Sequence, residues 1–114
     1  MPRFVVLTHD HPKLHWDFML ENEGVLRTWR LALEPDSYDS IEAEQIADHR
    51  IAYLNYEGPV SGGRGEVRCW DRGHFEVIEW TTSRLVTKMS GTRLKGIASL
   101  DRVGAGSSWA FHHA

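Results

Sequence analysis

Residues 8–21 read THDHPKLHWDFMLE. From residue 14 onward, apolar side chains alternate with a second series of residues. The apolar series is Leu14, Trp16, Phe18 and Leu20, and the second series is His15, Asp17, Met19 and Glu21. Successive side chains of a β-strand point to opposite faces of a sheet, so this period of two predicts a strand whose apolar face packs on the core. The polar groups of the segment then share the opposite face.

Other segments also have the patterns of β-strands. Residues 3–9, RFVVLTH, form the β-branched run of a buried strand. Residues 24–33, GVLRTWRLAL, follow the turn-like ENEG and predict a hairpin with the preceding strand. Between residues 66 and 103, short β-rich runs are separated by DRG, TTS and SGT, which is typical of a meander or a small barrel. The sequence therefore predicts a mainly β fold.

Residues 35–50, PDSYDSIEAEQIADHR, predict the exception, a short helix. Asp39 precedes Glu42 by three residues, which is a pattern found at helix N-caps. The apolar residues compatible with an amphipathic helix are Ile41, Ala43 and Ile46. This helix would end close to His49.

Composition limits the class of protein. The chain has 114 residues, of which 41% are hydrophobic and 25% charged, so we expect residues 1–114 to form a single globular domain. We expect a cytoplasmic location and no membrane partner, because no run approaches the roughly 20 apolar residues of a membrane span and no signal peptide is recognisable. A net charge of −3 argues against coating nucleic acid through bulk positive charge. Cys69 is the single cysteine, so any metal must be held by His, Asp or Glu.

The opening segment contains a candidate metal site. His15 and Asp17 lie two residues apart, which places an imidazole and a carboxylate side by side on one strand face. His9, just past the first strand, could supply a third ligand. His11 could contact a metal ligand or the substrate. Neutral imidazoles with one carboxylate suit Mn²⁺, Fe²⁺ or Zn²⁺. A strand with one solvated face would show the same alternation, so spacing alone leaves both interpretations open.

The remaining histidines are weaker candidates for catalytic or ligand-binding residues. His49 and Tyr53 are four residues apart, and a histidine and a phenol near a metal could position a phosphate or a leaving oxygen. By spacing alone, Tyr53 is more often an aromatic residue of the core or rim. We expect the other three histidines to be solvated surface residues; they are His74, His112 and His113.

A family resemblance joins these segments. FVVLTHDHPKLHWDFMLE resembles the FVVxxHDxxxLHxDxxLE opening of the 3′-phosphoesterase domain of bacterial multifunctional DNA ligase D, the end-healing module of bacterial non-homologous end joining. The resemblance continues in order through GVLRTW, DHRIAY, YEG, WDRG, GTRLKG and the late Trp109. It implies a compact antiparallel β-barrel with little helix and a groove-shaped metal site.

The resemblance also implies roles for particular residues. His9, His15 and Asp17 match the family's ligands for a divalent metal, typically manganese, with zinc as the alternative. His49 and Tyr53 match the catalytic residues that act at the phosphate. The implied partners are nucleic-acid 3′ ends, together with ligase or polymerase chains.

Two departures from the family concern phosphate binding. Met19 and Gln45 occupy positions where the family has phosphate-facing arginines. A thioether or an amide cannot supply the charge of a bidentate arginine contact. Arg50 or Arg64 could replace these cations, and Lys13 and Arg30 also lie close in sequence to the matched segments.

Three hypotheses follow for the function. The first is a metal-dependent phosphoesterase that acts on nucleic-acid 3′ ends, bearing a 3′-phosphate or a 3′-ribonucleotide, in DNA end-joining repair. The second is a non-catalytic, metal-containing module that binds DNA ends or a partner. The third is an iron-dependent oxygenase with an HxD…H facial triad formed by His15, Asp17 and His49. This third hypothesis fails if His9 rather than His49 completes the group of ligands.

Overall fold

The computed structural model describes residues 1–37 and 40–113, and within them the chain is almost entirely antiparallel sheet. The strands are β1 (Arg3–His9), β2 (His15–Asn22), β3 (Val25–Leu31), β4 (Ile41–His49), β5 (Gly58–Pro59), β6 (Glu66–Trp80), β7 (Arg84–Gly91), β8 (Lys95–Arg102) and β9 (Ser108–His113). The helical structure in these residues is a 3₁₀ helix, η1 (Ile51–Asn55). The mainly β prediction is confirmed.

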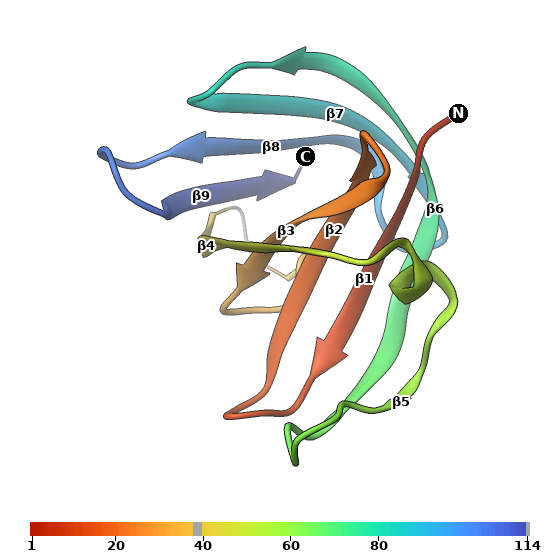
Figure 1. Cartoon of the computed structure of the whole chain (residues 1–114). Coiled ribbons are helices and arrows are strands. Elements are labelled where there is room, and N and C mark those ends of the chain that lie inside the picture. Colours follow the sequence, from red (N-terminus) through yellow and green to blue (C-terminus); the bar gives the residue numbers. More distant parts are fainter. Residues whose placement is uncertain (38–39, 114) are drawn as a thin grey trace.

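Eight of the strands close into a barrel in the order β1-β2-β3-β4-β9-β8-β7-β6, because β6 also pairs with β1 (Figure 1). The long, curved β6 makes this closure possible. Its first half pairs with β1 and its second half with β7, and the register shifts once in each pairing. The short β5 is added at the outer edge of β6. The antiparallel barrel implied by the family resemblance is therefore confirmed. No helix in the described part of the chain is both long and apolar enough to cross a lipid bilayer.

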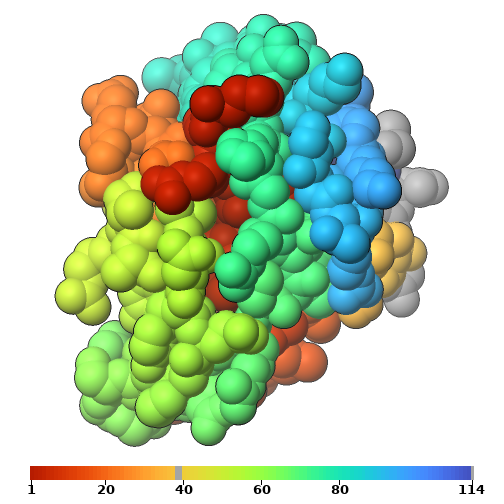
Figure 2. All heavy atoms as spheres, turned by 90° about the vertical axis from the view of Figure 1, so that its right-hand side faces the viewer, coloured from red at the N-terminus to blue at the C-terminus, as the bar shows by residue number. Residues whose placement is uncertain are grey.

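The strands β1 to β3 are covered on both faces. Inside the barrel lies the main core, to which these strands contribute Phe4, Val6, Phe18, Leu20, Trp29 and Leu31. Outside it lies a second apolar cluster, made of Val5, Leu7, Met19, Leu26, Leu54 and Val67. Leu54 belongs to η1, so this helix lies over the outer face of β1. Figure 2 shows β1 as a narrow strip between the segment containing η1 and β6.

The hairpin predicted from ENEG is confirmed as β2–β3. Asn22 pairs with Val25, which leaves Glu23 and Gly24 as a two-residue turn. Both turn residues have positive φ angles, 51° and 81°, as the right-handed twist of a tight hairpin requires. This turn fixes which residues of β2 and β3 lie opposite one another.

The predicted helix within residues 35–50 is wrong, because Ile41–His49 forms the strand β4. Ile41 and Ala43 are buried while Glu42 and Glu44 are exposed, so the period is two rather than 3.6. The strand lies between β3 and β9, where pairing on both sides overrides a weak helical preference. The proposed cap at Asp39 lies outside the described residues.

The meander predicted for the second half is confirmed as β6 to β9. The WDRG and GTRLKG segments meet within it. The buried Asp71 carboxylate accepts hydrogen bonds from the backbone N–H groups of Thr92, Arg93 and Leu94, at 3.0, 3.1 and 2.8 Å. The Arg93 guanidinium lies 3.8 Å from the centroid of the Trp70 ring. These two segments of the resemblance therefore stabilise a turn of the barrel.

Candidate metal centre

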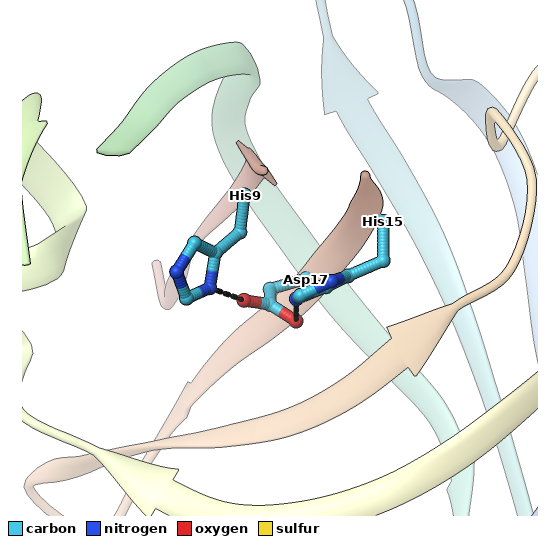
Figure 3. Close-up of side chains that lie close together, drawn as sticks. All are labelled: His9, His15 and Asp17. Atoms are coloured by element: carbon cyan, nitrogen blue, oxygen red, sulfur yellow. Dashed lines mark ion pairs between the residues drawn. The ribbon is translucent and has the colours of Figure 1, made fainter. Parts of the chain in front are cut away.

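Two neighbouring strands bring His9, His15 and Asp17 together. His9 ends β1 and pairs with His15, which begins β2, and their ring centroids are 4.9 Å apart. Asp17 follows two residues later on the same face. One donor atom from each residue lies within 4.8 Å of the other two. Figure 3 shows the two imidazoles on either side of the Asp17 carboxylate.

The hydrogen bonding of His15 fixes which ring nitrogen is free. Its Nδ1 lies 2.9 Å from the Lys13 carbonyl, which can only accept, so Nδ1 carries the proton. In the neutral ring Nε2 then presents its lone pair 3.3 Å from Asp17 Oδ1. Neither atom has a hydrogen-bond partner, although both are buried. Burying two acceptors that face each other in this way lowers the stability of the fold unless a cation lies between them.

A backbone carbonyl also orients the His9 ring. Its Nε2 donates to the Arg64 carbonyl at 2.7 Å, so in the neutral ring Nδ1 is the free nitrogen. Nδ1 lies 3.7 Å from Asp17 Oδ2. Histidine ligands of metals usually donate their second N–H to a carbonyl or carboxylate, which sets the tautomer and the ring orientation. Both histidines satisfy this condition before any cation binds.

The spacing of the donor atoms fits a small divalent cation. Two ligands that each lie about 2.1 Å from a metal are roughly 3.0–3.5 Å apart in octahedral or tetrahedral geometry. The contacts of 3.3 and 3.7 Å from the two imidazoles to Asp17 are close to this range. Two imidazoles and one carboxylate also leave coordination positions open for water or substrate. The residues present therefore suit a divalent metal ion.

A glycine-rich loop supplies the carbonyl that orients His9. Gly65 has a φ angle of +75°, and a Cβ there would lie 2.2 Å from Asp10 Oδ1. The Asp10 carboxylate in turn accepts the backbone N–H of Glu66 at 2.8 Å. Asp10, which belongs to the dense polar stretch of the sequence, thus holds this loop instead of joining the three donor residues.

A groove of about 390 Å³ extends from this cluster. Several residues implicated by sequence line it: His9, His11, Asp17, Met19, Arg30, His49, Arg50, Tyr53 and Arg64. His49 ends β4 and Tyr53 lies in η1, and their ring centroids are 5.5 Å apart in an edge-to-face arrangement. The groove thus combines two of the candidate ligands, His9 and Asp17, with the histidine–tyrosine pair.

The His49 ring is also oriented by its neighbours. Its Nδ1 lies 3.0 Å from the Ala47 carbonyl and 3.0 Å from the Thr28 hydroxyl oxygen. The carbonyl can only accept, so Nδ1 carries the proton. Nε2 has no hydrogen-bond partner among the described residues, so it is available to accept or donate a proton. His49 does not belong to the cluster of three donors, so the HxD…H triad of the oxygenase hypothesis is not formed in the described structure.

The two replaced arginine positions differ in their surroundings. Met19 is 1% exposed, and its side chain packs in the outer apolar cluster beneath the groove. Gln45 is exposed and does not line the groove. Neither position places a cation at the candidate metal centre.

Arg30 is one of the cations that line the groove at this centre. It pairs with Asp17 across β2 and β3 and lines the groove. Sequence reasoning named it only for its proximity in the chain. The two-residue turn of the hairpin is the signal that could have placed it opposite Asp17.

A second hollow, of about 640 Å³, lies next to the groove. His15 and Arg30 line it, together with residues from β4, β9 and the segment before β9. Most of its lining is apolar, with Leu14 and Val103 exposed at its walls. Arg30 lines both the groove and the hollow.

Other polar residues lie apart from the three donors. Glu21 shares the strand face of Asp17, but Arg3 binds it through side-chain contacts of 3.1 and 2.8 Å. The Arg3 guanidinium holds the pKa of the Glu21 carboxyl below its usual value. His74 and His112 are exposed, and the partly exposed His113 contacts the Lys95 carbonyl, as expected for surface residues.

Comparison with known proteins identifies the family. A family model described as the DNA ligase D 3′-phosphoesterase domain matches residues 7–102. The chain belongs to this family. The matched range includes every candidate site residue named above, from His9 to Arg64. The predicted family membership is therefore confirmed.

Individual relatives agree with this assignment. The multifunctional non-homologous end joining protein LigD of Pseudomonas aeruginosa is 34% identical over 82 residues, which cover 68% of this chain and 10% of the relative. The multifunctional non-homologous end joining DNA repair protein LigD of Mycobacterium tuberculosis is 29% identical over 120 residues, which cover 96% of this chain and 15% of the relative. The chain therefore spans a small part of the length of these relatives.

Proposed function

We propose that this chain is a metal-dependent phosphoesterase that acts on nucleic-acid 3′ ends, removing a 3′-phosphate or a 3′-ribonucleotide in DNA end-joining repair. Its family membership supports this class of reaction. The observation that carries the proposal is the pair of buried acceptors, His15 Nε2 and Asp17 Oδ1, which face each other without a hydrogen-bond partner. We assign His9, His15 and Asp17 as ligands of one divalent cation, with manganese first and zinc as the alternative.

The groove residues have complementary roles in this proposal. A bound divalent cation supplies Lewis-acid stabilisation of the charge that develops on the phosphoryl group. His49, whose Nε2 faces no hydrogen-bond partner among the described residues, positions the leaving oxygen or, as the imidazolium with both nitrogens protonated, donates a proton to it. Tyr53 donates its phenol hydroxyl to a phosphate oxygen. Arg50 and Arg64 line the same groove and bind phosphate at its outer part.

The family description supports a substrate for this chain. Because the matched family is described as the DNA ligase D 3′-phosphoesterase domain, we propose nucleic-acid 3′ ends as the substrate. The relatives are named as multifunctional proteins of non-homologous end joining, and we propose separate ligase or polymerase chains as protein partners.

A labelled primer–template with a 3′-phosphate or a 3′-ribonucleotide tests the proposed function. We expect the wild-type protein with Mn²⁺ to convert the primer end, and His15→Ala to lose at least roughly 100-fold of this rate because a metal ligand is removed. His74→Ala is the matched control, because His74 is exposed on β6 and does not line the groove. Its activity should equal that of the wild type.

A second candidate function accounts for a negative result in this assay. Neither Met19 nor Gln45 supplies the charge of the family's arginines, which favours a module that binds DNA ends without turnover. Wild-type protein that binds Mn²⁺ and primer–template DNA but converts neither 3′ end would favour that module over the enzyme.

The glycine-rich loop provides a second test of the metal assignment. Gly65→Ala leaves all three ligands in place, but its Cβ would displace Asp10 and with it the loop carbonyl that orients His9. We expect calorimetric titration to show Mn²⁺ affinity about tenfold lower, the size of effect typical for partners of metal ligands.

Gly63→Ala is the control for the loop variant. Gly63 also has a positive φ angle, +67°, but a Cβ there has no neighbour within 4 Å. The two variants therefore share the backbone strain and differ in the displacement of Asp10 and the neighbouring His11. Equal Mn²⁺ affinity for both variants would contradict the role assigned to the loop.

A further inference from the structure

Arg30 lies at the junction of the groove and the neighbouring hollow, beside the candidate metal centre. Paired residues of antiparallel strands project their side chains to the same face, about 4.5–5.5 Å apart at Cβ. Asp17 and Arg30 are such a pair, so the guanidinium stands on the face that carries the candidate ligands. We propose that Arg30 binds a phosphate oxygen of the substrate beside the cation; this inference rests on the proposed function.

The first argument is that the charge of Arg30 has no partner in the part of the chain that is described. Its Nε is buried and makes no hydrogen bond. None of the ion pairs formed within residues 1–37 and 40–113 includes Arg30. A charged donor removed from water without a partner is costly, and a bound anion offsets that cost. The side chain is therefore arranged for a ligand.

The second argument concerns the carboxylates that flank Arg30. Register places it between Asp17 on β2 and Glu44 on β4. Asp17 lies against the two imidazoles instead. Glu44 is exposed, and none of the ion pairs within the described residues joins it to Arg30. The guanidinium thus remains free to bind an anion over the metal centre.

The third argument is that the other cations of the groove are less suited to this position. The Arg64 guanidinium donates to the Ser61 carbonyl at 2.7 Å and to the Ser61 hydroxyl at 3.2 Å. Arg50 is exposed at the start of η1. Neither is paired in the sheet with a candidate ligand, whereas Arg30 is. Arg30 therefore supplies the charge that Met19 lacks, from the neighbouring strand.

The position of Arg30 also bears on the substrate. Arg30 borders two open spaces, the groove that contains His9 and Asp17 and the neighbouring hollow. A phosphate bound there can carry an ester group on either side. A planar guanidinium can contact two oxygens of such a phosphate, while a lysine acts as a point charge.

Titration calorimetry with thymidine 3′-monophosphate on Mn²⁺-loaded protein tests the proposal. We expect Arg30→Met to bind this probe roughly 10- to 100-fold more weakly, the effect of losing one charge-assisted contact. Arg30→Lys should retain part of the affinity. Arg84→Met is the matched control, because Arg84 lies on β7 and pairs with Asp101 outside the groove. Its affinity for the probe should match the wild type.

Mn²⁺ titration of the same proteins shows whether a negative result contradicts the role of Arg30 or the proposed function. Unchanged probe affinity in Arg30→Met, with normal Mn²⁺ binding, would overturn the role of Arg30 and leave the proposed function standing. Loss of Mn²⁺ binding in Arg30→Met would also overturn it, because Arg30 would then maintain the metal centre. A wild-type protein that binds no divalent cation would overturn the proposed function itself. If Arg30→Met does not fold, Arg30→Gln decides, because glutamine keeps a polar side chain and removes the charge; probe affinity equal to the wild type in Arg30→Gln would overturn the role of Arg30.

Discussion

Without metal, Asp17→Asn is expected to unfold at a higher temperature than the wild-type protein, and with Mn²⁺ the order is expected to reverse. The Asp17 side chain is 2% exposed, and its Oδ1 faces His15 Nε2 without a hydrogen bond. A buried carboxylate oxygen without a donor or a cation opposes folding. Asparagine keeps the size of the side chain and removes its charge, so the metal-free fold should gain stability.

The reversal with Mn²⁺ follows from the linkage between binding and folding. A ligand that binds only the folded state stabilises it by about 2.7 kcal/mol when its free concentration is 100 times Kd. In a domain of this size that corresponds to a rise in Tm of about 10 °C. Asp17→Asn has lost the only carboxylate among the three donors and should show little of this rise.

Thermal unfolding followed by circular dichroism, in EDTA and in Mn²⁺ or Zn²⁺, measures both effects. Asp101→Asn is the control, because Asp101 is a partly exposed carboxylate that pairs with Arg84. The metal should raise the Tm of Asp101→Asn by as much as it raises the Tm of the wild type. A metal-induced rise of equal size in Asp17→Asn would contradict the assignment of Asp17 as a ligand.

The candidate site was predictable where local spacing decides the geometry. Period two in β2 places His15 and Asp17 on one face, and the tight approach of β1 to β2 brings His9 beside them. The sequence alone does not show that carbonyls of Lys13 and Arg64 fix the histidine tautomers. The Arg64 carbonyl comes from a loop 55 residues away, so the orientation of His9 depends on tertiary structure.

The spacing of His49 and Tyr53 left their structural element open, because residues four apart can share one face of a helix, lie at a helix end, or lie on one side of a strand. In the structure His49 ends a strand and Tyr53 lies in the following 3₁₀ helix, and the rings still meet at 5.5 Å. The wrong prediction was the helix within residues 35–50. There a pattern resembling a helix N-cap competed with a strand pattern, in which Ile41 and Ala43 alternate with glutamates. Pairing with β3 and β9 decides in favour of the strand, and a local pattern carries no information about that pairing.

Arg30 shows how register carries information that spacing does not. A hairpin with a two-residue turn at Glu23 and Gly24 pairs residues at equal distances from the turn, so Asp17 must lie opposite Arg30. The exact turn length was not fixed by the ENEG pattern. A shift of one residue would move every side chain of one strand to the other face, so the pairing could not be derived without the turn.

The apolar face of β2 was predicted to be the inner face, and the structure confirms this for Trp16, Phe18 and Leu20. Phe18 is 1% exposed, and its ring packs edge-on against Phe111 with centroids 5.2 Å apart. The prediction is incomplete on the other face, because Met19 is also buried, in the outer cluster. Phe18 is thus one of the side chains that pack the inner face of β2 on the main core.

Phe18→Ala is therefore expected to lower the free energy of unfolding by about 3–5 kcal/mol, through lost burial and the cavity left behind. Urea denaturation of the metal-free protein measures this loss. Ile78→Ala is the control, because Ile78 is an apolar residue of β6 that is 56% exposed, and its replacement should change stability by less than about 0.5 kcal/mol. A loss below about 1 kcal/mol in Phe18→Ala would mean that the faces of β2 are reversed. The Asp17 carboxylate would then point into the barrel, where no divalent cation could reach it from solvent.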